Sequence, residues 1–437
     1  MSDAAKLTTG NSAVAKDDFS REPVPDTNTY SGMHIALIIV GGVIGIPAFL
    51  QASQVGGSLG LQAASYAFAV GCLILGVLGG LTSYVGAKTR YSTYMLTEFA
   101  FGRQGAKLVN LVIAISLIGW FAVICNVFAD AALLTMKEGF GLAIPKWFYI
   151  ILGAFLFVGI TLSGFKGIDK LALFLVPLML IFLAYAAILS WDDVPSWTAT
   201  STDVRLTFST AVSSVVGGYI AGVVIQPDYS RFARNIWHAV WAAFLALCVV
   251  QAFVFFMAAV PSVATGEVDL IKIMVSLGIG VPAFLLLLLS SWCSNVLCLY
   301  SSALSISTIA TRAHLKTIIF IIGVVGTALA FAYSPSFFIS FLVLLGISIP
   351  PIASIYVIDA ILIRRGSCNV ESLETEGKID FAAFAAWVFA SIVGYLTVNE
   401  YLRLTGASAF DTIVLASLIY TALKANLIRK SWGAESS

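Results

Sequence analysis

The chain has 437 residues, of which 59% are hydrophobic and 11% charged, and its formal net charge is +1. A soluble domain carries roughly a quarter of its residues charged, so most of this surface must face lipid rather than water. The near-neutral charge and the lack of a basic patch interleaved with aromatic residues argue against nucleic acid as a partner. The sequence shows no Ser/His/Asp triad, metal-ligand spacing or phosphate-binding loop, and therefore does not favour an enzyme.

Hydropathy windows of about nineteen residues predict about twelve transmembrane helices. In chain order they cover residues 33–57, 62–87, 107–136, 146–165, 170–190, 208–229, 237–260, 281–310, 316–333, 336–362, 380–398 and 406–428. Residues 1–30 are polar and lack a signal-peptide pattern, so we expect them and residues 429–437 to be cytoplasmic tails. The prediction is an all-α integral membrane protein.

The distribution of positive charge orients these spans. With the N-terminus inside, the external segments hold only Lys137, Lys146, Arg205, Lys272 and Arg403, and the other Lys and Arg residues lie in cytoplasmic segments. This asymmetry follows the positive-inside rule, and one missed helix would invert every later loop. We therefore expect both termini in the cytoplasm. The loop at residues 89–105 is amphipathic, and we expect it to lie along the inner membrane surface as a helix.

Two glycine clusters lie near the middle of spans one and six, at residues 41–47 and 217–222, and Pro47 and Pro227 accompany them. Glycine and proline weaken a helix, although glycine also permits close packing between membrane helices. Because the two spans are five helices apart and run in opposite directions, the clusters occupy corresponding positions of an inverted repeat. This predicts broken helices 1 and 6, repeats at 31–190 and 208–365, and peripheral helices 11 and 12 at 380–428.

Span eight carries polar residues at mid-depth, including Ser291, Ser294 and Asn295. Serine hydroxyls in a membrane helix often bond back to the preceding turn, so a purely structural role stays open. Carbonyls freed in a broken span one, together with hydroxyls from span eight, could also bind a hard cation such as sodium. Asn295 is the most polar residue near mid-span, and we expect it to reach a substrate.

An aromatic pair and two carboxylates complete the candidates. Trp120 lies too deep in span three to be an interface anchor, so it is either core packing or a ligand platform. Tyr219 in span six would be the opposing ring, and two such faces suit a planar heterocycle. Asp228 and Asp359 border spans, where carboxylates are functional candidates. Because both lie near span ends, we expect gate or salt-bridge roles for them.

Five short motifs follow one another along the chain. They are Gly-Ala-Lys-Thr at 86–89, Phe-Ala-Phe-Gly at 99–102, Gly-Trp-Phe at 119–121, Asp-Tyr-Ser-Arg-Phe-Ala-Arg at 228–234, and Ile-Pro-Pro at 349–351 followed by Asp359. Their order and spacing resemble the nucleobase:cation symporter family, and most closely the bacterial cytosine permeases, from about Gly32 to the last span. The resemblance implies a LeuT-like five-plus-five inverted-repeat fold in a bacterial inner membrane, with alternating access. It also implies sodium- or proton-driven uptake of a purine, a pyrimidine or a related heterocycle.

The resemblance also assigns a site. For the substrate it implies Trp120 and Tyr219 as stacking rings. Together with the polar residues of span eight, we expect the substrate to be surrounded by Gly45, Leu117, Ala221, Ser291 and Asn295. For sodium it implies carbonyls of Gly41, Ile44, Gly45 and Ser290, with Cys293 and Ser294 at the positions of two hydroxyl ligands. Three positions depart from the family, which has Ser or Thr at Cys293, glutamine at Leu117 and serine at Ala221. A thiol is a poor sodium ligand, and the other two losses remove hydrogen bonds to a base edge.

These departures leave the identities of the coupling cation and of the substrate open. Sodium is the expected cation and a proton the alternative. The substrate is cytosine or another small planar heterocycle, such as a purine, a hydantoin-like ring or a vitamin-precursor pyrimidine. A channel would need polar residues repeated along a pore, whereas here they cluster at one depth. We expect the lipid bilayer as the surroundings, a monomer as the working state, and no nucleic-acid partner.

Overall fold

The computed structural model describes most of the chain and consists of helices and their connections. It covers residues 19, 22–162, 165–198, 206–267, 280–310, 312–334, 338–371, 373, 377–399, 401–402, 404–405 and 407–428. Within the helices, the side chains of residues 46, 138–139, 165–172, 280–290 and 339 lie outside the described part. One isolated parallel bridge joins Tyr30 to Ala233.

The elements run in the following order. The first half of the chain forms η1 (Asp26–Asn28), α2 (Gly32–Val43), α3 (Ile46–Thr89), α4 (Thr93–Phe101), α5 (Gly105–Phe140), α6 (Lys146–Thr161) and α7 (Phe165–Leu189). The second half forms α8 (Phe208–Val224), α9 (Pro227–Ser230), α10 (Ile236–Phe244), η2 (Leu245–Val250), α11 (Gln251–Thr265), α13 (Gly280–Ser307), α14 (Leu315–Ala332), α15 (Phe338–Ser348), α16 (Pro350–Ile358), η4 (Asp359–Ile363), α18 (Phe381–Val398) and α19 (Ser408–Leu423). Of these, η1 is a 3-10 turn, whereas η2 and η4 are π-helical.

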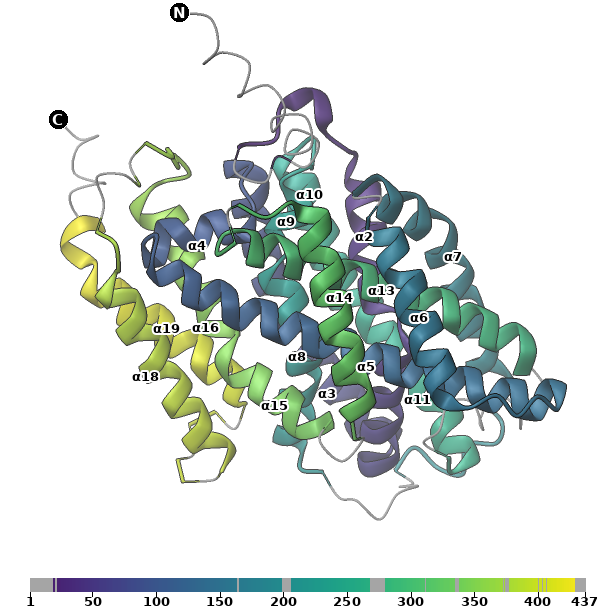
Figure 1. Ribbon diagram of the computed structural model, residues 1–437. Coiled ribbons are helices and arrows are strands. Elements are labelled where there is room, and N and C mark those ends of the chain that lie inside the picture. Colours follow the sequence, from purple (N-terminus) through teal and green to yellow (C-terminus); the bar gives the residue numbers. More distant parts are fainter. Residues whose placement is uncertain are drawn as a thin grey trace, which may run out of the picture.

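The helices pack as one bundle (Figure 1). α13 lies along α5, and α3 lies along α8, α10 and α11. α18 and α19 pack on each other and contact α16, and Figure 1 shows them in yellow-green and yellow at one side of the bundle. We call the end of the bundle that carries η1, α4 and α9 the tail side.

The outer surface of the bundle is apolar. In the described residues, seven helical stretches are long and apolar enough to cross a membrane, and four shorter apolar helices accompany them. Large side chains such as Tyr66, Leu73, Phe155, Phe174 and Ile188 are exposed on this surface. An exposed apolar surface this extensive is unstable in water and is expected of helices in lipid. The protein is therefore a multi-pass membrane protein.

The chain leaves the helix between α2 and α3. α2 ends at Val43, and Ile44 and Gly45 have extended backbone angles before α3 begins at Ile46. Pro47 lies in the first turn of α3, where its missing N–H costs no helical hydrogen bond. α3 is then divided by Gly60, whose φ of 75° favours glycine. The two parts of α3 correspond to the end of the first expected span and to the second.

The glycine cluster in span six has a different structure from the one we expected. α8 continues through residues 217–222 and ends at Val224, and α9 starts at Pro227. A Cβ on Gly217 would overlap the backbone oxygen of Leu342, and one on Gly222 would lie 2.6 Å from the ring of Tyr219. These glycines therefore allow close packing, and the prediction that the cluster itself unwinds is wrong.

The amphipathic loop after α3 also differs from its prediction. It forms α4, as expected, but all nine residues of α4 are buried. The helix packs against α5, α16 and η4, and Thr93 at its start donates its backbone N–H to Asp228 Oδ1 at 2.9 Å. Its apolar side chains thus face protein on every side, and the expectation of a helix on the membrane surface is wrong.

Candidate functional site

A cavity of about 70 Å³ lies where α2 gives way to α3. It is lined by Gly42, Val43, Gly45, Pro47, Ala48, Gln51, Leu117, Trp120, Ile124, Gly218, Tyr219, Ala221, Gly222, Ile225, Tyr229, Gln251, Phe255, Ser294, Leu297 and Cys298. Residues from α2, α3, α5, α8, α9, α11 and α13 thus meet at one point. A space of this size is a compact pocket at one level of the bundle.

Five of the seven residues expected around a substrate line this cavity: Gly45, Leu117, Trp120, Tyr219 and Ala221. The Trp120 ring is held nearly edge to face by Phe338 and Phe341 of α15, with centroids 6.2 and 5.7 Å away. The Tyr219 hydroxyl donates to the backbone oxygen of Ile39 at 3.3 Å, which ties α8 to α2. Both aromatic rings are therefore fixed by neighbouring helices.

The other two expected substrate residues, Ser291 and Asn295, are not among the lining residues. Both are fully buried in α13. Both polar atoms of the Asn295 amide, and the Ser291 hydroxyl, have no hydrogen-bond partner among the described residues. Their neighbours Ser294 and Cys298 do line the cavity, so contact between Asn295 and a substrate stays a prediction.

The expected cation residues are only partly brought together. Ser294 donates its hydroxyl to the backbone oxygen of Gly42 at 3.2 Å, and a Cβ on Gly45 would lie 3.1 Å from the same hydroxyl. Ser294 therefore lies at the interruption between α2 and α3. Gly41 and Ile44 flank the lining residues of that segment without lining the cavity themselves. Cys293 is buried and also does not line it, and the side chain of Ser290 lies outside the described residues.

Two glutamines and a tyrosine that our sequence reasoning missed also line the cavity. Gln51 lies on α3 and donates its Nε2 to the backbone oxygen of Ser214 at 2.6 Å. Gln251 is the first residue of α11, and Tyr229 of α9 hydrogen-bonds Ser301 at 3.2 Å. The sequence did contain an indication of the two glutamines, because each is an amide inside an otherwise apolar span. Burying a polar group there is unfavourable unless it has a partner.

Asp228 lies on the tail side, outside the cavity lining. It is 1% exposed and accepts the Thr93 N–H at the start of α4. Arg231, which is fully buried, donates Nε to the backbone oxygen of Asp228 at 3.3 Å and Nη1 to that of Phe19 at 2.8 Å. This cluster joins α9 to α4 and to the segment before α2.

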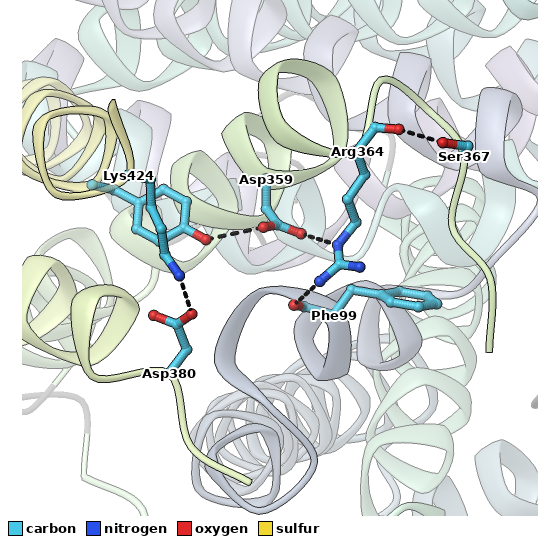
Figure 2. A network of polar contacts seen from close by, with 7 residues as sticks. Phe99, Asp359, Arg364, Ser367, Asp380 and Lys424 are labelled. Carbon is cyan, nitrogen blue, oxygen red and sulfur yellow. Dashed lines mark hydrogen bonds and ion pairs between the residues drawn. The ribbon is translucent and has the colours of Figure 1, made fainter. Parts of the chain in front are cut away.

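Asp359 occupies a second polar cluster, which Figure 2 shows between α19, η4 and α4. Its Oδ2 pairs with Arg364 Nε at 2.6 Å, and its Oδ1 accepts the Tyr420 hydroxyl at 3.0 Å. Arg364 also donates Nη2 to the backbone oxygen of Phe99 at 2.8 Å. Beside it, Lys424 pairs with Asp380. Asp359, the first residue of η4, is therefore bound to α19 directly and to α4 through Arg364, and neither residue lines the cavity.

A lipid-exposed bundle of apolar helices around a partly polar cavity is the architecture of a membrane transporter. The structure of Mhp1, a nucleobase-cation-symport-1 family transporter, in a closed conformation with bromovinylhydantoin bound, is similar with a TM-score of 0.81. The match covers 94% of this chain and 95% of that chain, at 20% sequence identity.

The chain belongs to the family of permeases for cytosine and purines, uracil, thiamine and allantoin, whose model matches residues 23–417. It is 28% identical to the cytosine permease of Escherichia coli (strain K12) over 356 residues, which are 80% of this chain and 82% of the relative. It is 25% identical to the hydantoin permease of Microbacterium maritypicum over 397 residues, which cover 83% and 81%. The predicted family and the all-α, LeuT-like fold class are thus confirmed, and the relatives are permeases and not enzymes. The count of twelve transmembrane helices stays a prediction.

Proposed function

We propose that this chain is a secondary active symporter that takes up a nucleobase such as cytosine, or a related planar N-heterocycle, together with sodium. The observation that carries the proposal is the cavity, in which Trp120 and Tyr219 share one space with Ser294 at the interruption between α2 and α3. An aromatic platform and freed backbone carbonyls at one depth suit simultaneous binding of a ring and a cation. Alternating access would then release both on the other side.

The lining favours a flat ligand that binds mainly through its ring faces. Leu117, Ile124, Ala221 and Phe255 leave much of the cavity wall apolar. Stacking on an aromatic side chain contributes about 1–3 kcal/mol per base and tolerates many ring types. Because Leu117 and Ala221 cannot hydrogen-bond a base edge, the proposal extends to relatives of cytosine, such as a purine, a hydantoin-like ring or a vitamin-precursor pyrimidine.

Sodium is the proposed coupling ion because Ser294 contacts the carbonyl of Gly42 where the backbone leaves the helix. We expect Ser294→Ala to raise the sodium concentration for half-maximal effect on heterocycle binding by roughly 5- to 10-fold, since one polar ligand is lost. Titrating sodium against the binding of radiolabelled cytosine or uracil measures this. Ser302→Ala is the control, because that hydroxyl bonds only its own helix at Leu299. An unchanged sodium response in Ser294→Ala would place the cation elsewhere.

Proton coupling is the second candidate, and the observation that favours it is Cys293. A buried thiol stands at one of the two hydroxyl positions that the family uses for sodium, and it does not line the cavity. Since thiolates prefer soft metals, this position adds little to a sodium site. If a proton is the coupling ion, heterocycle binding would respond to pH and not to sodium.

The proposal includes an orientation and two gating residues. We propose that the chain lies in a bacterial inner membrane with the tail side and both termini in the cytoplasm, and that helices 1–5 and 6–10 form inverted repeats. Asp228 and Asp359 would then help to hold the cytoplasmic side closed, because each ties a core helix segment to α4. Opening that side would require these contacts to separate.

A thermal-shift screen of the purified protein tests the function. Cytosine, uracil, adenine, hypoxanthine, hydantoin and thiamine-precursor pyrimidines are each added with and without sodium. We expect one planar compound to raise the melting temperature, and sodium to increase the shift, because ligands that bind the folded state stabilise it. A shift that ignores sodium would support proton coupling. No shift with any heterocycle would contradict the proposed substrate class.

A further inference from the structure

One polar side-chain atom in the cavity receives no hydrogen bond from the described protein. It is Oε1 of Gln251, a residue that is 2% exposed and lines the same cavity as Trp120 and Tyr219. A buried amide oxygen without a donor costs about 1–3 kcal/mol. Because no described residue supplies a donor, this oxygen is free to accept a hydrogen bond from a molecule that enters the cavity.

Four other polar residues of the lining make a side-chain hydrogen bond within the protein. Tyr219 bonds Ile39, Ser294 bonds Gly42 and Tyr229 bonds Ser301. Gln51 is anchored through Nε2 to Ser214, and its amide packs so closely on Gly218 that no Cβ would fit there. The amide of Gln251 thus differs from these four groups, because its buried oxygen is left to bind the polar edge of a ring.

The backbone before Gln251 has an unusual conformation that presents this side chain. The π-helical segment η2 ends at Val250, and the backbone N–H of the next residue, Gln251, donates to the oxygen of Ala246, five residues back. A π-turn holds an extra residue, so it rotates the following side chains by about 100° relative to an unbroken α-helix. Gln251 and Phe255, one turn later, both line the cavity in this register. π-turns of this kind occur frequently at functional sites.

We propose that Gln251 is a specificity-determining residue that binds the hydrogen-bonding edge of the transported ring. Its Oε1 accepts a hydrogen bond from a ring N–H or an exocyclic amine, and its Nε2 donates to the adjacent ring nitrogen or carbonyl. A carboxamide binds such an adjacent donor–acceptor pair in two parallel hydrogen bonds, as glutamine does with adenine. The inference rests on the proposed function and narrows its substrate class to planar rings with a donor next to an acceptor.

Gln251→Met tests the inference, because methionine keeps the length of the side chain without its hydrogen bonds. Binding of cytosine, uracil and hydantoin, and of their N-methylated counterparts that lack the ring donor, is measured by isothermal titration with the full chain. We expect the best parent compound to lose about 10- to 100-fold in affinity in the variant. Its N-methylated counterpart should change far less, so that the discrimination of the wild type disappears.

Gln54→Met is the matched control. Gln54 lies on α3 and also has an unpaired amide oxygen, but it does not line the cavity, so its loss should leave both affinities unchanged. If the wild type binds a heterocycle and Gln251→Met keeps both the affinity and the discrimination, the role of Gln251 is wrong and the proposed function stands. If the wild type binds none of the parent compounds, the proposed function and this inference fall together.

Discussion

Trp120→Ala is expected to weaken binding of the heterocycle strongly while the protein still purifies as a folded bundle. Removing one aromatic platform costs about 1–3 kcal/mol per stacked base, which is roughly a 5- to 150-fold loss of affinity. The cavity has few polar groups that could compensate, because lining residues such as Leu117 and Ala221 carry no hydrogen-bonding side chain. Isothermal titration with the compound that stabilises the wild type measures the loss.

Two further variants separate stacking from stability. Trp120→Phe keeps a ring against Phe338 and Phe341 and should therefore retain more of the affinity than Trp120→Ala. Trp241→Ala removes a tryptophan of α10 that is 57% exposed and does not line the cavity, so binding should be unaffected. Wild-type affinity in a folded Trp120→Ala protein would show that the ring is core packing only.

Asp359→Asn is expected to destabilise the protein far more than Asp130→Asn. Each carboxylate forms an ion pair at 2.6 Å, but the side chains of Arg364 and Asp359 are 14% and 6% exposed, whereas those of Lys146 and Asp130 are 37% and 49% exposed. Removing one partner of a buried pair leaves an uncompensated charge and costs about 3–5 kcal/mol. An exposed pair contributes only about 0–1 kcal/mol, since water solvates both charges.

The melting temperatures of the two variants in the same detergent measure this difference. Transport by the variants that remain folded adds a test of the gate, because Asp359 joins η4 to α19 and α4 (Figure 2). Equal melting temperatures for the two variants would contradict the buried character of the Asp359 pair. A stable Asp359→Asn protein with unchanged transport would remove Asp359 from the gating proposal.

The sequence carried enough information for the class of protein and its family. Apolar runs repeated along the chain leave lipid as the only suitable solvent, and that argument needs no tertiary contact. Short motifs such as Gly-Trp-Phe at 119–121 placed the chain in its family, and the family's matched region covers residues 23–417. Trp120, Tyr219 and Ser294, selected from depth, chemistry and resemblance, were found around one cavity.

Tertiary contacts decided the remaining features, because they depend on what each helix face meets. The glycines at 217–222 proved to be packing positions, since whether a glycine frees the backbone or admits a neighbour is set by the facing residue, here Leu342 or Tyr219 itself. α4 is buried because α5, α16 and η4 cover its apolar face in place of lipid. Gln251 lines the cavity because the π-turn of η2 rotates the side chains that follow it, and a hydropathy profile does not show such a turn.

By itself the sequence determined the solvent, the fold class and the family, since these depend on composition and local motifs. Only the tertiary structure decided which polar groups share the cavity, since that depends on how distant helices pack.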